Sequence, residues 1–143
     1  MNEYLLPFCS IFDSIIKVYD FDVKSIGDDT ILLVRDSYQI EFVMWREAVE
    51  VNFCLIKSHS DVLSYYVRNF IVTYMNDDDR IVVCNIENFK DNFVYTRNLK
   101  SLCFFSNALK NHFSCMLEGR MDWLEAYEKS EWYSEPRVEK RKA

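Results

Sequence analysis

Residues 38–57, YQIEFVMWREAVEVNFCLIK, hold two runs of alternating apolar and polar side chains, separated by the polar pair Arg46-Glu47. A period of two places successive side chains on opposite faces of a strand. A two-residue break between such runs fits a tight hairpin. The stretch therefore predicts an antiparallel pair of strands, 38–45 and 48–57, with one face buried under helices. The opposite face is expected to carry Glu41, Glu50 and Asn52.

Upstream of this pair, 21–26 and 30–36 are also expected to be strands. The turn signal Gly27-Asp28-Asp29 separates them, and Asp36-Ser37 can close a second tight hairpin. Such short connections favour a meander. We therefore expect an α+β fold, in which an antiparallel β-meander of about four strands packs against N-terminal and C-terminal helices.

Apolar side chains that recur at spacings of three and four predict the helices. The expected ranges are 5–19, about 60–75, 99–117 and a short helix capped by Asp122 in which Trp123, Leu124 and Tyr127 face inward. Gly119 stands where the third helix needs a C-cap. The β-branched residues 71–73 leave a strand possible there, so the type of 71–86 stays open. Residues 87–97 suggest an irregular loop with Phe89, Phe93 and Tyr95 turned inward.

Length and charge limit the range of functions. The 143 residues fit one domain, here 1–130, followed by a charged tail, 131–143, that is expected to fray. A net charge of −6 repels phosphate backbones and attracts basic partners, which argues against nucleic acid. No apolar run is long enough for a membrane span. Five widely spaced cysteines without a CxxC pattern suggest reduced thiols and a cytoplasmic protein.

The sequence offers little support for catalysis, a metal or a cofactor. Ser58-His59-Ser60-Asp61 holds the residue types of a hydrolase triad, but neighbouring residues cannot converge on one substrate atom. His112 and Cys115 are one helical turn apart, yet zinc needs further ligands and a nucleophilic thiol needs an oxyanion site. Asp77-Asp78-Asp79 lacks the glycine and glutamate of a calcium loop, which favours a solvated acidic loop. Two glycines cannot form the usual phosphate-binding loops. We therefore expect a non-enzyme without cofactors, although paired carboxylates that meet only in the fold remain possible.

Binding to another protein is the better-supported role. Large amphipathic side chains such as Trp45 are enriched at interfaces, and acidic residues gathered on one face would attract a basic partner. The residues that we expect to contact a partner are Asp28, Asp29, Trp45, Asp77, Asp78, Asp79, Glu125 and Glu128.

Two segments carry a family resemblance. The first helix ends in IIKVYDFDV, residues 15–23, and the last in LEGRMDWLEAY, residues 117–127. In this order of elements, over about 5–130, the chain resembles the immunity proteins of bacterial contact-dependent growth inhibition systems. The resemblance implies a cytoplasmic protein that binds a cognate toxin domain, often a basic nuclease, and blocks its active site or substrate path. A non-catalytic adaptor for some other protein fits the residues equally well, and the oligomeric state is left open.

Overall fold

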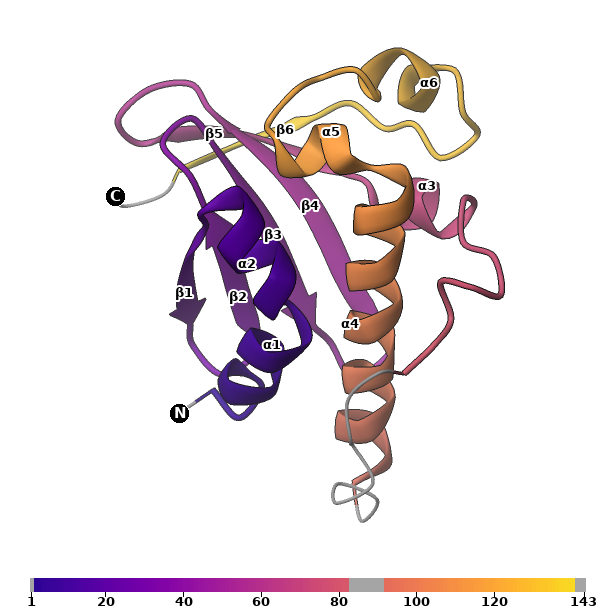
Figure 1. Cartoon of the computed structure of the whole chain (residues 1–143). Helices are drawn as coiled ribbons and strands as arrows, with labels where there is room; N and C mark the ends of the chain where they lie inside the picture. The colour runs from indigo at the N-terminus through magenta and orange to yellow at the C-terminus, as the bar shows by residue number, and fades with distance from the viewer. Residues whose placement is uncertain (1, 83–91, 141–143) are drawn as a thin grey trace.

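The structure is a computed structural model and describes residues 2–82 and 92–140 (Figure 1). Six antiparallel strands form one sheet in the order β1-β2-β3-β4-β5-β6, so each strand pairs with its neighbours in sequence. The predicted α+β meander is confirmed, with six strands instead of about four. The strands are β1 (Asp22–Ile26), β2 (Thr30–Val34), β3 (Tyr38–Met44), β4 (Val49–Ile56), β5 (Asp61–Tyr66) and β6 (Arg137–Lys140).

Both predicted two-residue hairpins are present. The backbone N–H of Arg35 donates to the carbonyl of Tyr38 at 3.0 Å, and that of Trp45 donates to the carbonyl of Ala48 at 3.0 Å. The second hairpin fixes the register of β3 and β4, in which Glu41 lies opposite Asn52 and Val43 lies opposite Glu50. In this register Glu41, Glu50 and Asn52 lie together on the face opposite the helices, as predicted.

The helices lie on one face of the sheet or near one edge of it. Figure 1 shows α1, α2 and α4 across one face, with α3, α5 and α6 toward the β5 side. Two of the predicted helices are each divided, one at Phe12 and the other at Phe113. The helices are α1 (Leu5–Ile11), α2 (Asp13–Tyr19), α3 (Arg68–Val72), α4 (Phe93–His112), α5 (Ser114–Leu117) and α6 (Leu124–Glu128).

The helix expected at 60–75 is wrong in its first half. Residues 61–66 form β5, and only 68–72 are helical, so 71 and 72 belong to a helix rather than a strand. The apolar residues of this segment fit a strand as well as a helix. In a strand, Leu63 and Tyr65 lie on one face of the sheet, and Val62 and Ser64 lie on the other. Pairing with the free edge of β4 outweighed the helical pattern. Residues 83–86 lie outside the described residues.

The irregular loop expected at 87–97 is also wrong in its described part, because α4 already begins at Phe93. The side chain of Asn92 accepts a hydrogen bond from the backbone N–H of Tyr95 at 3.0 Å, which is an N-cap. Tyr95 is buried as predicted, whereas Phe93 is 76% exposed. Phe89 lies outside the described residues.

The tail that was expected to fray is ordered in part, because it contains the strand β6. Residues 137–140 pair with β5 as the edge strand β6, and Lys140 forms an ion pair with Asp61. The hydroxyl of Tyr127 also accepts a hydrogen bond from the backbone N–H of Ser134 at 3.2 Å. The polar backbone groups at the β5 edge explain the difference, because a free strand edge offers N–H and C=O groups to which another strand can pair. Residues 141–143 lie outside the described residues.

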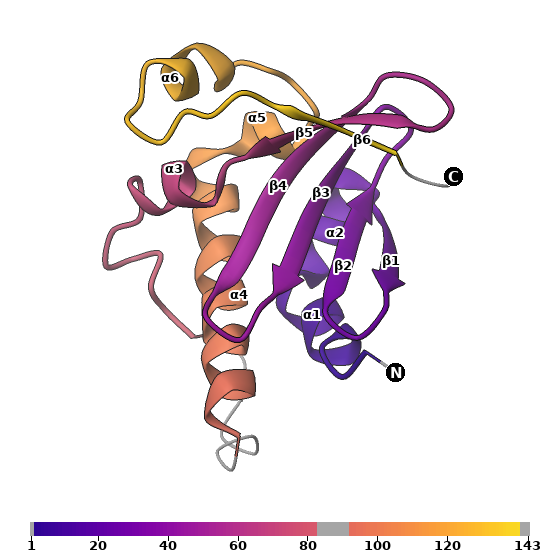
Figure 2. The same cartoon turned by 180° about the vertical axis from the view of Figure 1, so that it is seen from behind.

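The two faces of the sheet differ. The face under α1, α2 and α4 holds the core, which includes Ile40, Phe42, Val51 and Phe53. Trp123 and Tyr127 are buried as predicted, although Trp123 rather than Asp122 occupies the N-cap of α6. Figure 2 shows the opposite face, over which no helix of the described residues lies. We call this second surface the open face.

Candidate partner-binding surface

The eight predicted contact residues fall in three separate places. Asp28 and Asp29 form the turn between β1 and β2, next to Trp45, since the backbone N–H of Met44 donates to the carbonyl of Asp29 at 2.7 Å. Asp77, Asp78 and Asp79 lie in the turn after α3. Glu125 and Glu128 lie on α6, at the opposite end of the sheet from the β3–β4 hairpin (Figure 1). The predicted residues therefore do not form one acidic platform.

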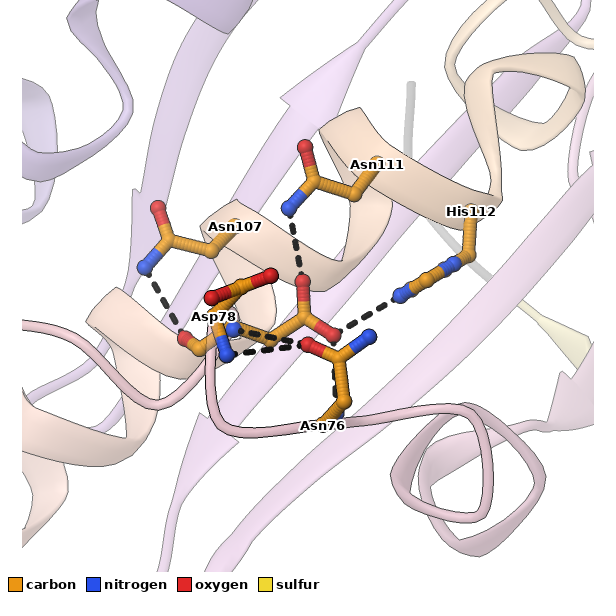
Figure 3. Close-up of polar contacts among 6 residues, drawn as sticks. Asn76, Asp78, Asn107, Asn111 and His112 are labelled. Carbon is orange, nitrogen blue, oxygen red and sulfur yellow. Dashed lines mark hydrogen bonds and ion pairs between the residues drawn. The ribbon is translucent and has the colours of Figure 1, made fainter.

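Asp79 corrects the prediction of a solvated acidic loop. Its side chain is 0% exposed, whereas Asp77 and Asp78 are exposed. Its Oδ2 accepts a hydrogen bond from the backbone N–H of Asn76 at 3.0 Å, and its Oδ1 accepts one from Asn111 Nδ2 at 2.7 Å. Asp79 thus anchors the turn to α4 and is not available to a partner. In Figure 3, the dashed lines from the labelled Asn111 and His112 end on the carboxylate of Asp79, which carries no label there.

The charge of Asp79 is stabilised by these donors. Burial alone would raise the pKa of the carboxyl, but the hydrogen bonds from Asn76 and Asn111 and the nearby His112 together hold the pKa below its ordinary value. His112 Nε2 lies 2.7 Å from Asp79 Oδ2. The group is therefore a buried structural anion.

The open face carries an acidic cluster that consists of Glu41, Trp45, Glu50 and Asn52, of which only Trp45 is among the predicted contact residues. Nδ2 of Asn52 donates to Glu41 Oε1 and to Glu50 Oε2, each at 2.7 Å. The indole N–H of Trp45 donates to Glu50 Oε1 at 3.2 Å. Two carboxylates thus share one neutral amide beside an exposed aromatic ring.

The sequence did contain a signal for this cluster. A two-residue hairpin at Arg46-Glu47 sets Met44 opposite Val49, and counting back by residue pairs then sets Glu41 opposite Asn52. Glu50 precedes Asn52 by two residues and so lies on the same face. Register, rather than the density of acidic residues along the chain, identifies the cluster.

A groove of about 730 Å³ occupies another part of the same face. Leu32 and Val62 on its floor are buried, and Lys24, Arg35 and His59 are among its lining residues. Leu32 lies opposite Glu41 in the β2–β3 register, so the groove adjoins the acidic cluster. The open face therefore combines an apolar hollow with separate basic and acidic areas, as protein interfaces commonly do.

Two residues of the motifs considered for catalysis, Asp61 and Cys115, have shifted pKa values. Asp61 pairs with Lys140, and hydrogen bonds from Lys140 and Ser58 lower the pKa of its carboxyl. Burial raises the pKa of the Cys115 thiol, which disfavours the reactive thiolate, and no hydrogen bond among the described residues joins it to His112. Cys9, Cys54, Cys103 and Cys115 are free thiols, and Cys84 lies outside the described residues.

Within 2–82 and 92–140, no three His, Cys, Asp or Glu side chains gather closely enough to hold a metal ion. No helix in those ranges combines the length and the apolar character that crossing a membrane requires. Comparisons with family models, with curated proteins and with solved structures gave no significant match.

Proposed function

We propose that this chain is an immunity protein that binds a cognate toxin domain in the cytoplasm and neutralises it by covering its active site or substrate path. The observation that carries the proposal is the open face, where a groove of about 730 Å³ adjoins the acidic cluster around Asn52. The resemblance of 15–23 and 117–127 to immunity proteins indicates a toxin domain as the partner.

Charge supports a basic partner. The net charge of −6 attracts a positively charged protein, and electrostatic attraction raises association rates. Toxins that act on nucleic acids are commonly basic because their substrates are polyanions. A basic nuclease domain is therefore the partner that best matches the charge of this chain.

The test is reconstitution with the toxin domain encoded beside this chain. We expect the two purified proteins to elute as one complex in size-exclusion chromatography, and one equivalent of the chain to abolish nuclease activity. A toxin domain that elutes separately and stays fully active in excess chain would contradict the proposal.

The alternative is a non-catalytic adaptor for another protein, which the open face would serve equally well. The two functions differ in gene neighbourhood and in effect on the partner. A large secreted-protein gene upstream and loss of the partner's activity favour immunity. A partner that keeps its activity in the complex favours the adaptor.

A further inference from the structure

The groove on the open face is formed by side chains from five neighbouring strands. Lys24 on β1 lies opposite Leu32 on β2, and Ile56 on β4 lies opposite Val62 on β5; all four line the groove. The backbone N–H of Ile56 donates to the carbonyl of Ser37 at 3.0 Å, so the β4–β5 hairpin is held against the β2–β3 turn. The groove therefore extends from β1 to β5, at the end of the sheet where both of these connections lie (Figure 2).

The floor of the groove is apolar, although no helix of the described residues covers it. Leu32 and Val62 are buried there, and Ile26, Val34 and Ile56 add to the apolar lining. Ile26 is 45% exposed, so part of this apolar surface is in contact with solvent. The volume of about 730 Å³ lies within the range of roughly 300–1,000 Å³ that small-molecule sites occupy. The groove therefore has the size and the lining of a site for a ligand with an apolar body.

The charge of the groove is opposite in sign to that of the whole chain. Its lining holds the cationic side chains of Lys24 and Arg35, the acid Asp36 and the imidazole of His59, whereas the chain has a net charge of −6. Arg35 Nη1 already donates to two backbone carbonyls at the C-terminal end of α2, at 3.1 and 3.0 Å. Among residues 2–82 and 92–140, neither Lys24 nor His59 forms a hydrogen bond or an ion pair. Lys24 is therefore the cation that is available to a ligand.

We propose that the groove binds a small amphipathic anion, which consists of a carboxylate on an apolar body, with the carboxylate at Lys24 and the body over Leu32 and Val62. An ammonium group donates charge-assisted hydrogen bonds to a carboxylate, and these are stronger than neutral ones. The apolar body displaces water from the floor, which a small hydrophilic anion cannot do. The site does not depend on the toxin-binding function proposed above, because neither the groove nor its test requires a protein partner.

The experiment uses decanoate as the probe, at concentrations below those at which it forms micelles. Decanoate is titrated into ¹⁵N-labelled protein, and the backbone N–H signals of Leu32 and Val62 are followed by NMR. We expect saturable shifts at both signals with a dissociation constant below about one millimolar. Octanoate should bind up to about tenfold more weakly, since each buried CH₂ group contributes about fourfold. Acetate should leave both signals unchanged, and decyltrimethylammonium, which joins the same chain to a cation, should bind at least several-fold more weakly than decanoate.

Matched variants place the ligand in the groove. Lys24→Met removes the charge and keeps an unbranched side chain, and Lys100→Met makes the same change at an exposed position of α4, on the opposite face of the sheet. We expect K24M to weaken decanoate binding at least several-fold and K100M to leave it unchanged, with both spectra well dispersed. Val34→Phe puts a larger apolar side chain into the groove and should also weaken decanoate binding.

Three outcomes would each overturn the proposal. They are shifts that stay linear up to the highest decanoate concentration, equal binding of decanoate and decyltrimethylammonium, and undiminished decanoate binding to K24M. None of them bears on the toxin-binding function, which stands or falls with the reconstitution of the toxin complex. A chain that binds decanoate but no toxin domain would retain the groove site and lose the immunity function.

Discussion

The hydroxyl of Tyr38, on the first residue of β3, donates a hydrogen bond to the backbone carbonyl of Leu117 at 2.7 Å. Gly119 closes the end of α5 beside it. The backbone N–H of Gly119 donates to Met116, and that of Arg120 donates to Cys115, which together form a Schellman motif. The Tyr38 ring thus packs against the turn that ends the helix, and this contact joins the sheet to the C-terminal third of the chain.

Gly119→Ala should be strongly destabilising for two reasons. Gly119 has a φ of +78°, which disfavours a side chain, and a Cβ built there would lie 2.3 Å from Cε1 of Tyr38. We expect a loss of about 2–4 kcal/mol in the free energy of unfolding, measured by urea denaturation with tryptophan fluorescence. Gly27→Ala is the control, because Gly27 has a φ of +61° but open space around it, and should cost only about 1 kcal/mol. Equal losses would contradict a steric role for Tyr38.

Asp79→Asn should destabilise the fold at neutral pH by about 1–3 kcal/mol, because it removes a buried anion that three donors hold. The pKa of Asp79 is lowered in the folded protein, so its stabilising contribution is present above the unfolded pKa. The contribution is lost as the pH falls through the lower folded pKa. The difference between wild type and D79N should therefore be constant near neutrality and shrink below about pH 4.

The control for this pH series is Asp77→Asn, which changes an exposed carboxylate in the same turn. We expect D77N to unfold at nearly the wild-type urea concentration across the pH range. A D79N penalty that persists undiminished at pH 3 would show that geometry, rather than charge, is what Asp79 contributes.

Trp123 carries a buried donor within the core under the helices. Its indole N–H is buried without a partner among the described residues, while its ring contacts Phe53 and Tyr65 at centroid distances of 5.2 and 5.6 Å. Trp123→Phe removes the unsatisfied donor and retains an aromatic ring, so we expect a change within about 1.5 kcal/mol. Trp123→Ala should cost about 3–5 kcal/mol by calorimetry or urea unfolding. If W123F lost as much free energy of unfolding as W123A, the indole N–H would have a partner.

Local patterns predicted β1 to β4 and failed at β5 and β6. The alternation and the tight hairpin in 38–57 fixed β3, β4 and their register, because both signals lie within the segment that pairs. β5 and β6 carry weaker patterns of their own, and pairing along the β4 and β5 edges decides their conformation. Sequence reasoning about single segments cannot detect such a dependence.

The sequence also predicted only part of the candidate site. Glu41, Glu50 and Asn52 were placed on the correct face by alternation, but their shared amide emerges only from register and side-chain rotamers. For Asp79, the prediction from the sequence was wrong. Three consecutive aspartates predict a solvated loop, and no local pattern indicates that Asn111 and His112, more than thirty residues later, meet the third of them.

The rate of association tests which end of the sheet meets the partner. Asp28 lies in the β1–β2 turn and lines a hollow together with Arg46 of the β3–β4 hairpin, close to the Trp45 end of the acidic cluster. Glu128 lies on α6 at the opposite end of the sheet (Figure 1). If the partner docks on the acidic cluster, Asp28→Lys should slow association with the basic toxin domain several-fold at low salt, and Glu128→Lys should slow it less. Stopped-flow rates at increasing ionic strength check this, because screening should bring both variants to the wild-type rate. A larger effect at Glu128 would move the docking surface to α6, since steering is strongest for charges that face the approaching partner.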